Sequence, residues 1–176
     1  MSEPTIRLMH YDPRWRQEFQ QTQSSILQCC EGWVSAVEHI GSTAIGGLIA
    51  RPTIDVLAGV NIESCDAHED PITEAAKLIE GLNFRRESSH AWAPTATVLV
   101  KPRSGQETHR VFLMQSGSPL WNQALSIRDH LRSNPEVAVR FEETKVARWR
   151  SGDGDPQKYR RDKAVFLTHL VDQLGK

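Results

Sequence analysis

The sequence has little of several features that mark particular classes of protein. It contains only three cysteines, an odd number without Cys-x-x-Cys spacing, so neither a disulfide framework nor a zinc site is expected. It has no apolar run near the ~20 residues that a membrane helix requires. Its first twenty residues carry charges throughout and include no apolar core of a signal peptide. These absences predict a cytoplasmic protein that is not a membrane protein.

The sequence also lacks a large excess of charge of either sign. It has 21 Lys and Arg against 22 Asp and Glu, a formal net charge of −1. Nucleic-acid binding usually depends on a strong positive field, so these numbers do not favour DNA or RNA as the partner. Basic clusters at 145–150 and 158–163 remain open to two interpretations, a binding surface or a solvated helix face. The length and the apolar share of 39% suit one domain, or one domain with a small appendage.

The spacing of apolar residues predicts a mixed α/β region followed by a helical region, with a boundary near residue 118. Strands are expected over 33–40, 53–60, 84–86, 96–101 and 108–114. Helices are expected over 13–31, 43–49, 63–82, 120–132, 135–149 and 157–174. The helix over 43–49 is interrupted by Gly46-Gly47, and the helix over 63–82 is broken early by Pro71.

The most informative segment is the run His39-Ile-Gly-Ser-Thr-Ala44, followed by Asp55 within an apolar strand. A Gly-Ser turn that opens a helix offers backbone N–H groups and a hydroxyl to phosphate oxygens. An Asp on the next strand can hold Mg²⁺ against the same phosphates. The alternative is structural: Ser42 caps a tight turn and Asp55 caps a strand end.

The carboxylates expected of a polymerase-type metal site are incomplete. Leu57 stands at the second position after Asp55, where a paired carboxylate would be required, and Glu107 is the nearest acidic candidate for a third position. Because two-metal phosphoryl transfer needs at least two carboxylates around its ions, one-metal chemistry and binding without chemistry both stay open.

Several motifs, in order and over nearly the whole chain, resemble the GrpB family, whose fold is that of the nucleotidyltransferases. The matching segments are Tyr11-Asp-Pro-Arg-Trp15, Val37-Glu-His-Ile-Gly-Ser-Thr-Ala-Ile45, Arg51-Pro-Thr-Ile-Asp-Val56, Thr108-His109, Ile127-Arg-Asp-His-Leu-Arg132 with Asn134-Pro135, and Lys145 and Lys163. Two positions depart from the family pattern: Gly46 replaces a usual Pro, and Phe112 replaces a second His.

The resemblance implies a nucleotidyltransferase-like mixed β-sheet with flanking helices over 1–118. It implies a helical region over 119–176 that packs over the cleft as part of one compact unit. It implies catalytic roles for Asp55 and His109, with Asp55 also the metal ligand. It implies phosphate or nucleotide contacts by Gly41, Ser42, Thr43, Arg128, Lys145 and Lys163. A charge on a helix surface is the structural alternative for each of the last three.

Two functions follow as hypotheses. The first is Mg²⁺-dependent transfer of a nucleotidyl group from a nucleoside triphosphate to a small acceptor. The second is a non-catalytic protein that binds a nucleotide or another phosphorylated molecule at a degenerate carboxylate site, as Leu57 suggests. The family fold is a firm guide to architecture and a loose guide to chemistry.

Overall fold

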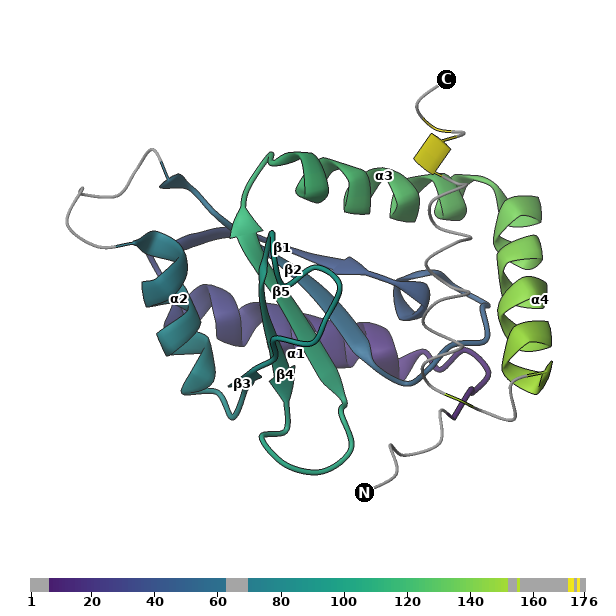
Figure 1. The fold of residues 1–176 in the computed structure, drawn as a ribbon, viewed down its shortest axis with the longest axis horizontal. Coiled ribbons are helices and arrows are strands. Elements are labelled where there is room, and N and C mark those ends of the chain that lie inside the picture. The colour runs from purple at the N-terminus through teal and green to yellow at the C-terminus, as the bar shows by residue number, and fades with distance from the viewer. Residues whose placement is uncertain (1–6, 63–69, 152–154, 156–170, 173, 175–176) are drawn as a thin grey trace.

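The computed structural model describes residues 7–62, 70–151, 155, 171–172 and 174 (Figure 1). The strands are β1 (Val34–Ile40), β2 (Ile54–Val60), β3 (Arg85–Arg86), β4 (Thr97–Lys101) and β5 (His109–Gln115). The helices are α1 (Arg14–Cys29), the short 3₁₀ helix η1 (Ser42–Ala44), α2 (Pro71–Glu80), α3 (Pro119–Ser133) and α4 (Pro135–Ser151). None of the helices described is long and apolar enough to cross a membrane.

The five strands form one mixed sheet in the order β1-β2-β5-β4-β3. The central pair, β2 and β5, is parallel, and the other neighbours are antiparallel. In the parallel pair Asp55 lies opposite Arg110, and Leu57 lies opposite Phe112. The expected mixed sheet with flanking helices and a helical region after it is therefore confirmed.

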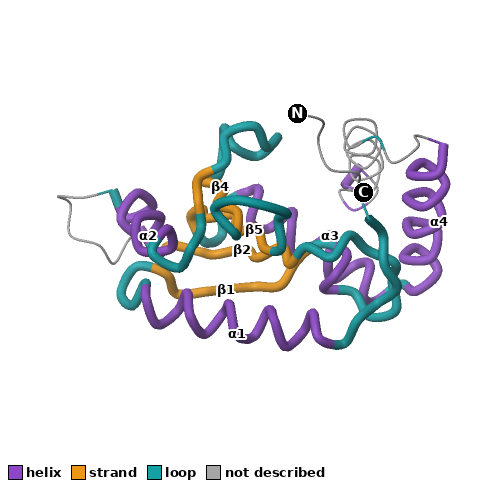
Figure 2. Tube along the Cα trace, turned by 90° about the horizontal axis from the view of Figure 1, so that it is seen from below, coloured by secondary structure: helices purple, strands orange, loops and turns teal. Residues whose placement is uncertain are grey.

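The sheet separates two apolar layers. On one face, α1 and α2 pack against residues such as Val56, Val111 and Leu113. Figure 2 shows α1 running along β1 on that side. On the other face, Leu57 and Phe112 pack with residues of α3. Because side chains alternate along a strand, the position of each residue in β2 and β5 decides which layer it enters.

A third apolar cluster connects the two helices at the end of the described chain to the segment after β1. Ile45 and Leu48 of that segment pack with Leu131 of α3 and with Phe141 of α4. Polar contacts reinforce the connection at Ile49, whose N–H donates to Glu142 Oε2 at 2.9 Å and whose carbonyl accepts from Lys145 Nζ. These contacts fix α3 and α4 against the loop that carries the Gly-Ser turn.

The helix expected over 43–49 is only the single turn η1, because Ile45 is already extended, with φ −114 and ψ 113, before the chain reaches Gly46-Gly47. In α2, Pro71 is the first helical residue, and the Asp70 side chain accepts from the amides of Ile72 and Thr73. The expected segment 63–69 and most of 157–174 lie outside the described residues.

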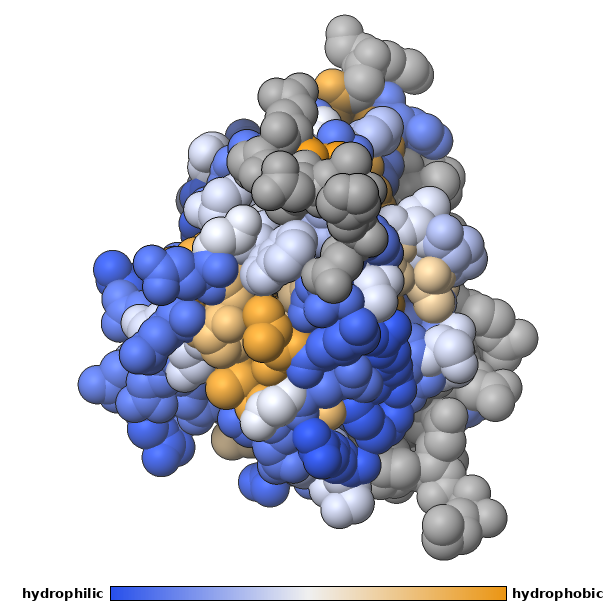
Figure 3. Space-filling model, turned by 90° about the vertical axis from the view of Figure 1, so that its left-hand side faces the viewer, coloured by the Kyte–Doolittle hydropathy of each residue, from blue (hydrophilic) through white to orange (hydrophobic). Residues whose placement is uncertain are grey.

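The side of the molecule that carries α2 is mainly hydrophilic, with a small apolar area among polar residues (Figure 3). Leu78 of α2 is one of the large apolar residues that remain exposed.

Candidate functional site

One cavity of about 300 Å³ lies on the α3 face of the sheet. Its wall is built from five parts of the chain: the segment after β1, β2, the loop before β4, β5 with the residues before it, and helices α3 and α4. The lining includes Gly41, Ser42, Thr43, Arg51, Asp55, Ser89, Trp92, Glu107, Arg110, Phe112, Ala124, Ile127, Arg128 and Phe141. The segment with the Gly-Ser turn and the strand with the acid thus meet at one site.

Gly41 and Asp55 are in close contact within this cavity. Gly41 has φ +75 and ψ −176, a conformation that is essentially restricted to glycine. A Cβ atom at this position would lie 2.6 Å from Asp55 Oδ2. The glycine is therefore required both for the turn and for the approach of the carboxylate. Because η1 is a single 3₁₀ turn, it offers its backbone amides without the dipole of a longer helix.

His39 supports the turn from the opposite side of the sheet. Its ring stacks on Phe19 of α1, with the ring centroids 4.6 Å apart and the planes 8° from parallel. His39 Nε2 lies 3.0 Å from Thr43 Oγ1, and that hydroxyl donates to the Thr53 carbonyl. Burial lowers the pKa of His39 to about 4, against the charge of Asp55, which raises it. His39 is thus neutral at pH 7, and its role is structural: it holds Thr43 of the turn against α1.

The charged end of the cavity holds an alternating series of four ionic side chains, Asp55, Arg110, Glu107 and Arg51. Arg110 Nη1 lies 3.6 Å from Asp55 Oδ1, and Arg110 Nη2 forms an ion pair with Glu107 Oε1. Arg51 Nη2 lies 3.5 Å from Glu107 Oε2. Three buried atoms of this series, Asp55 Oδ1, Glu107 Oε1 and Arg110 Nε, have no hydrogen-bond partner among the described residues. Such atoms are costly to bury unless a ligand or water completes them.

These residues do not fit a polymerase-type magnesium site. Leu57 is fully buried at the position of a second carboxylate. Glu107, the candidate for a further ligand, already pairs with two arginines. Within the described ranges no group of three or more His, Cys, Asp or Glu side chains could hold a metal ion. Asp55 is left as a single carboxylate with a guanidinium beside it.

The other end of the cavity is apolar and aromatic. The rings of Trp92 and Phe112 lie 4.6 Å apart, and His90 contacts both. The guanidinium of Arg110 lies over the Phe112 ring, 5.9 Å from its centre, and so joins the two ends. Nearby, the pKa of Glu87 falls to about 2 because the Ser89 hydroxyl and amide donate to its carboxylate. A ligand here would meet ring faces at one end and charges at the other.

Arg128 lines the cavity, but its guanidinium also fixes α3 to the edge strand. Arg128 Nη1 donates to Glu38 Oε2 at 2.5 Å and to the His39 carbonyl at 3.2 Å, and Arg128 Nε donates to Asp129 Oδ1 at 2.8 Å. If Arg128 also contacts a phosphate, as predicted, the phosphate competes with Glu38, Asp129 and the His39 carbonyl for the guanidinium N–H groups.

The structure does not bring His109 or Lys145 to the cavity. His109 belongs to the opposite side of β5 from Arg110, and its Nδ1 lies 2.9 Å from Thr108 Oγ1. Burial, with the nearby charge of Lys101, lowers its pKa. Lys145 is buried, with its ammonium over the Phe141 ring and bonded to the Ile49 carbonyl. Lys163 lies outside the described residues.

Arg110 is the residue of this site that the sequence reasoning missed. The signal was present in His109-Arg-Val-Phe112, because alternation places Arg110 and Phe112 on one face and His109 and Val111 on the other. Only the parallel register between β2 and β5 shows that this face is the one occupied by Asp55.

Comparison with known sequences shows where this chain has relatives. The profile of the family described as GrpB protein matches residues 5–173. The glutamate-rich protein GrpB of Alkalihalophilus pseudofirmus is 23% identical over 96% of this chain and 95% of its own length. A UPF0157 protein of Streptomyces coelicolor is 29% identical over 97% of this chain and 84% of its own length.

The fold is shared with a solved relative. The crystal structure of GrpB from Enterococcus faecalis superposes with a TM-score of 0.80 at 23% identity, covering 95% of this chain and 96% of that one. A structure of the Cid1 poly(U) polymerase gives a TM-score of only 0.48 at 12% identity, over 80% of this chain and 42% of that one. That likeness is too weak to support an argument about chemistry.

Proposed function

The chain belongs to the GrpB family, and from this premise and the geometry of the cavity we propose that it binds a nucleotide or another phosphorylated small molecule. The observation that carries the proposal is the division of one cavity into a charged end and an aromatic end. Gly41, Asp55 and Arg110 come from three separate segments and line the charged end. A phosphate group suits the first end, and an apolar or ring-bearing group suits the second.

The charged end supports a phosphate in two ways. Gly41, Ser42 and Thr43 border the cavity, and a Gly-Ser turn can offer backbone amides and a hydroxyl to phosphate oxygens. Arg51 and Arg110 add guanidinium groups, whose planar forks match phosphate oxygens better than an ammonium does. Phosphate contact by these residues and by Arg128 is part of the proposal.

The size of the cavity supports a small ligand. Its volume of about 300 Å³ lies at the lower end of the range for small-molecule sites, which are mostly apolar with a few placed polar groups. A mononucleotide or a phosphorylated metabolite fits this range better than a polymer does. The near-neutral net charge of −1 agrees with that preference.

Nucleotidyl transfer is the second candidate, favoured by one observation. Asp55 Oδ1 is buried, without a hydrogen-bond partner among the described residues, in a cavity that Gly41–Thr43 also line. Mg²⁺ is often held by one or two carboxylates together with substrate phosphates. Two residues disfavour this candidate: Leu57 stands where a second carboxylate would be required, and the guanidinium of Arg110 lies beside Asp55. Transfer with Mg²⁺ therefore ranks below binding.

Isothermal titration with ATP, GTP, CTP, UTP, ADP and inorganic pyrophosphate tests the proposed binding. We expect heat with at least one compound, and a loss of about tenfold in affinity in Arg51→Gln, because a charge-assisted hydrogen bond is removed. Arg86→Gln is the matched control, since Arg86 lies on β3, outside the cavity lining, and pairs with Glu80. No heat with any compound, or equal effects of the two variants, would contradict the proposal.

Mass spectrometry separates the two candidates. The protein is incubated with the nucleoside triphosphate that binds, Mg²⁺ and a mixture of small acceptors. Unchanged nucleotide after long incubation supports binding alone. Pyrophosphate and a nucleotidylated acceptor, both absent with Asp55→Ala, would instead establish transfer.

A further inference from the structure

We infer that Arg110 occupies the position of a metal ion in this site, so that the protein binds its phosphorylated ligand without a divalent cation. The inference rests on the proposed function and specifies how that function works. It concerns the contacts among Asp55, Arg110 and Glu107.

A phosphate at the Gly-Ser turn requires a cation between itself and Asp55. The Asp55 carboxylate is so close to Gly41 that a Cβ there would lie 2.6 Å from its Oδ2 atom. A phosphate bound at this turn would therefore lie beside a second negative charge, which repels it. Either a metal ion or a protein cation has to separate the two groups.

The structure contains a protein cation at that place. Parallel pairing puts Arg110 directly opposite Asp55, and its Nη1 atom lies 3.6 Å from Asp55 Oδ1. Mg²⁺ would bind a carboxylate oxygen at about 2.0–2.1 Å. An ion in that position would then lie within a few ångströms of the guanidinium and be repelled by it. Arg110 and Mg²⁺ are thus alternatives at Asp55.

Arg110 is held in place and still has donor capacity. The guanidinium is paired with Asp55 and with Glu107, and Glu107 is itself paired with Arg51. Arg110 Nε is buried and has no hydrogen-bond partner in the described part of the chain. Because that atom is shielded from the cavity, an oxyanion would accept from the Nη atoms: the side chain keeps 16% of its surface exposed, and Nη1 lies 3.6 Å from Asp55 Oδ1, beyond hydrogen-bond distance.

Arg110 also sets the orientation of the ligand. Its guanidinium lies over the Phe112 ring, which packs on Trp92. A phosphate on Arg110 therefore places the remainder of the ligand next to two aromatic side chains. The ligand class that this arrangement fits is a metal-free phosphate ester with a planar or apolar group.

The first test measures binding of ADP and pyrophosphate by titration, once in excess EDTA and once in excess Mg²⁺. Equal affinity in the two buffers is expected for the wild-type protein. Arg110→Gln should lower the affinity in EDTA by about tenfold or more, because it removes a fork that carries the charge. Arg110→Lys keeps the positive charge but loses the planar guanidinium, so its affinity in EDTA should lie between those of the wild type and Arg110→Gln. Thermal melting checks that this variant is folded. Wild-type binding that disappears in EDTA and returns with Mg²⁺ would overturn the inference.

The second test needs no nucleotide and therefore separates this inference from the proposed function. Uptake of Mn²⁺ is followed by the electron paramagnetic resonance signal of the free ion. Wild-type protein and the control Arg86→Gln should leave the signal unchanged. Arg110→Gln should take up Mn²⁺, and the double variant Arg110→Gln with Asp55→Asn should not. Two results would show that Arg110 does not exclude the ion. One is Mn²⁺ uptake by the wild type that is lost in Asp55→Asn, and the other is no Mn²⁺ uptake by Arg110→Gln.

The proposed function itself would be contradicted by a different result, the absence of ADP and pyrophosphate binding in both buffers of the first test.

Discussion

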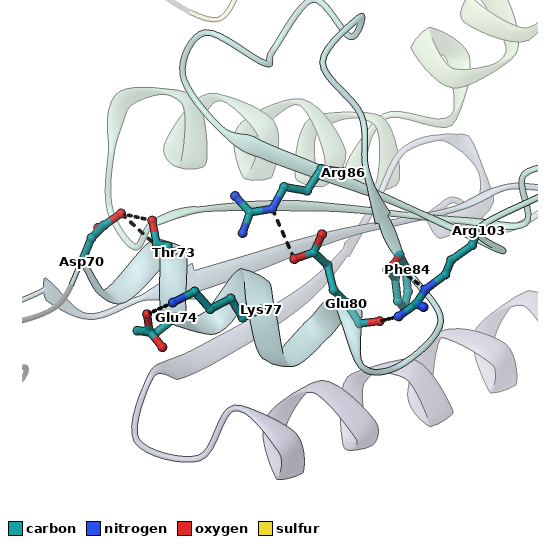
Figure 4. A network of polar contacts seen from close by, with 8 residues as sticks. All are labelled: Asp70, Thr73, Glu74, Lys77, Glu80, Phe84, Arg86 and Arg103. Atoms are coloured by element: carbon teal, nitrogen blue, oxygen red, sulfur yellow. Dashed lines mark hydrogen bonds and ion pairs between the residues drawn. The ribbon is translucent and has the colours of Figure 1, made fainter.

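Two groups of charged residues in this protein differ in how completely their polar atoms are paired. Around α2, each carboxylate has a close partner on the surface (Figure 4). Asp70 accepts from the hydroxyl of Thr73, Lys77 Nζ lies 2.5 Å from Glu74 Oε1, and Arg86 Nε lies 3.3 Å from Glu80 Oε2. In the cavity, by contrast, the side chains of Asp55 and Arg110 are only 15% and 16% exposed, and an atom of each has no hydrogen bond to any residue that the structure describes.

The charges around α2 are paired with near neighbours, whereas the cavity charges are buried with incomplete hydrogen bonding. The pairs around α2 are local and partly exposed, and such pairs contribute little to stability. Arg103 belongs to the same region, where its guanidinium donates to the carbonyls of Glu80 and Phe84 (Figure 4). The cavity residues come from distant segments and carry a desolvation cost that no complete set of hydrogen bonds offsets. An incomplete polar network that persists in a fold points to function.

The largest expected difference is in the response to acid of two supporting residues, His39 behind the Gly-Ser turn of the cavity and Asp70 at the start of α2. Burial lowers the pKa of His39 to about 4 from its ordinary 6.5, so the unfolded chain binds more protons between these values. Stability should therefore fall by on the order of 3 kcal/mol as the pH drops from 6.5 to 4. The pKa of Asp70 is lowered from 3.8, first by the Thr73 hydroxyl, so its contribution is lost only below about pH 4.

Urea unfolding at several pH values measures this difference. The slope between pH 4 and 6.5 should flatten in His39→Gln, whereas Asp70→Asn should alter stability by the same amount throughout that range. An identical slope in His39→Gln and the wild type would show that another group carries the acid sensitivity.

A smaller difference is expected when alanine replaces a glycine in each region. Gly41→Ala should cost about 1–3 kcal/mol, because the new Cβ meets Asp55 and the backbone conformation disfavours any other residue. Gly81 at the end of α2 has φ −63, which alanine adopts readily. A Cβ atom added there would lie 3.0 Å from the Leu78 carbonyl oxygen, its nearest neighbour. Gly81→Ala should therefore change stability by less than about 1 kcal/mol.

Thermal and urea unfolding measure the stability of the two glycine variants, and titration with the ligand measures their binding. Gly41→Ala should also lose binding of the compound that the wild type takes up, and Gly81→Ala should keep it. Normal binding by Gly41→Ala would mean that the contact between the turn and Asp55 has no part in the site.

The smallest expected effects come from removing one carboxylate from each group. Asp55→Asn should cost about 1–2 kcal/mol, because it leaves Arg110 with less compensation in a partly buried position. Glu80→Gln should cost less than about 0.5 kcal/mol, since its pair with Arg86 is 47% and 33% exposed. Unfolding at low and at high salt sharpens the contrast, because screening weakens mainly the exposed pair. Equal costs for the two variants would remove the distinction between the regions.

The sequence predicted most of the local structure because that structure depends on neighbouring residues. The apolar spacing of 13–31 predicts α1, and the runs before Ile40 and after Thr53 predict β1 and β2, all within two residues of their bounds. The extent of the helix after Ser42 was wrong, since the backbone is already extended at Ile45. Of the helix expected over 63–82, α2 covers Pro71–Glu80 behind a capping Asp70, and the part over 63–69 lies outside the described residues, so the break at Pro71 stays a prediction.

The candidate site was predictable only in part. Gly41, Ser42 and Asp55 stand in motifs whose spacing is specific, and all three line the cavity. His109 and Lys145 were chosen by motif as well, yet the first points to the other face of the sheet and the second is buried against Phe141. A motif gives the order of residues along the chain, whereas the face that each one occupies depends on register and packing.

The amino-acid sequence by itself determined the family, the sheet with its helices, and the Gly-Ser turn followed by a strand acid, because these depend on residue types at fixed short spacings. The tertiary structure alone decided which cation meets that acid. Arg110 reaches Asp55 only because β2 and β5 pair in parallel in a particular register, and a shift of one residue would place His109 or Val111 opposite Asp55 instead. Contacts between distant strands are set by the packing of both faces of the sheet, and no local pattern contains that information.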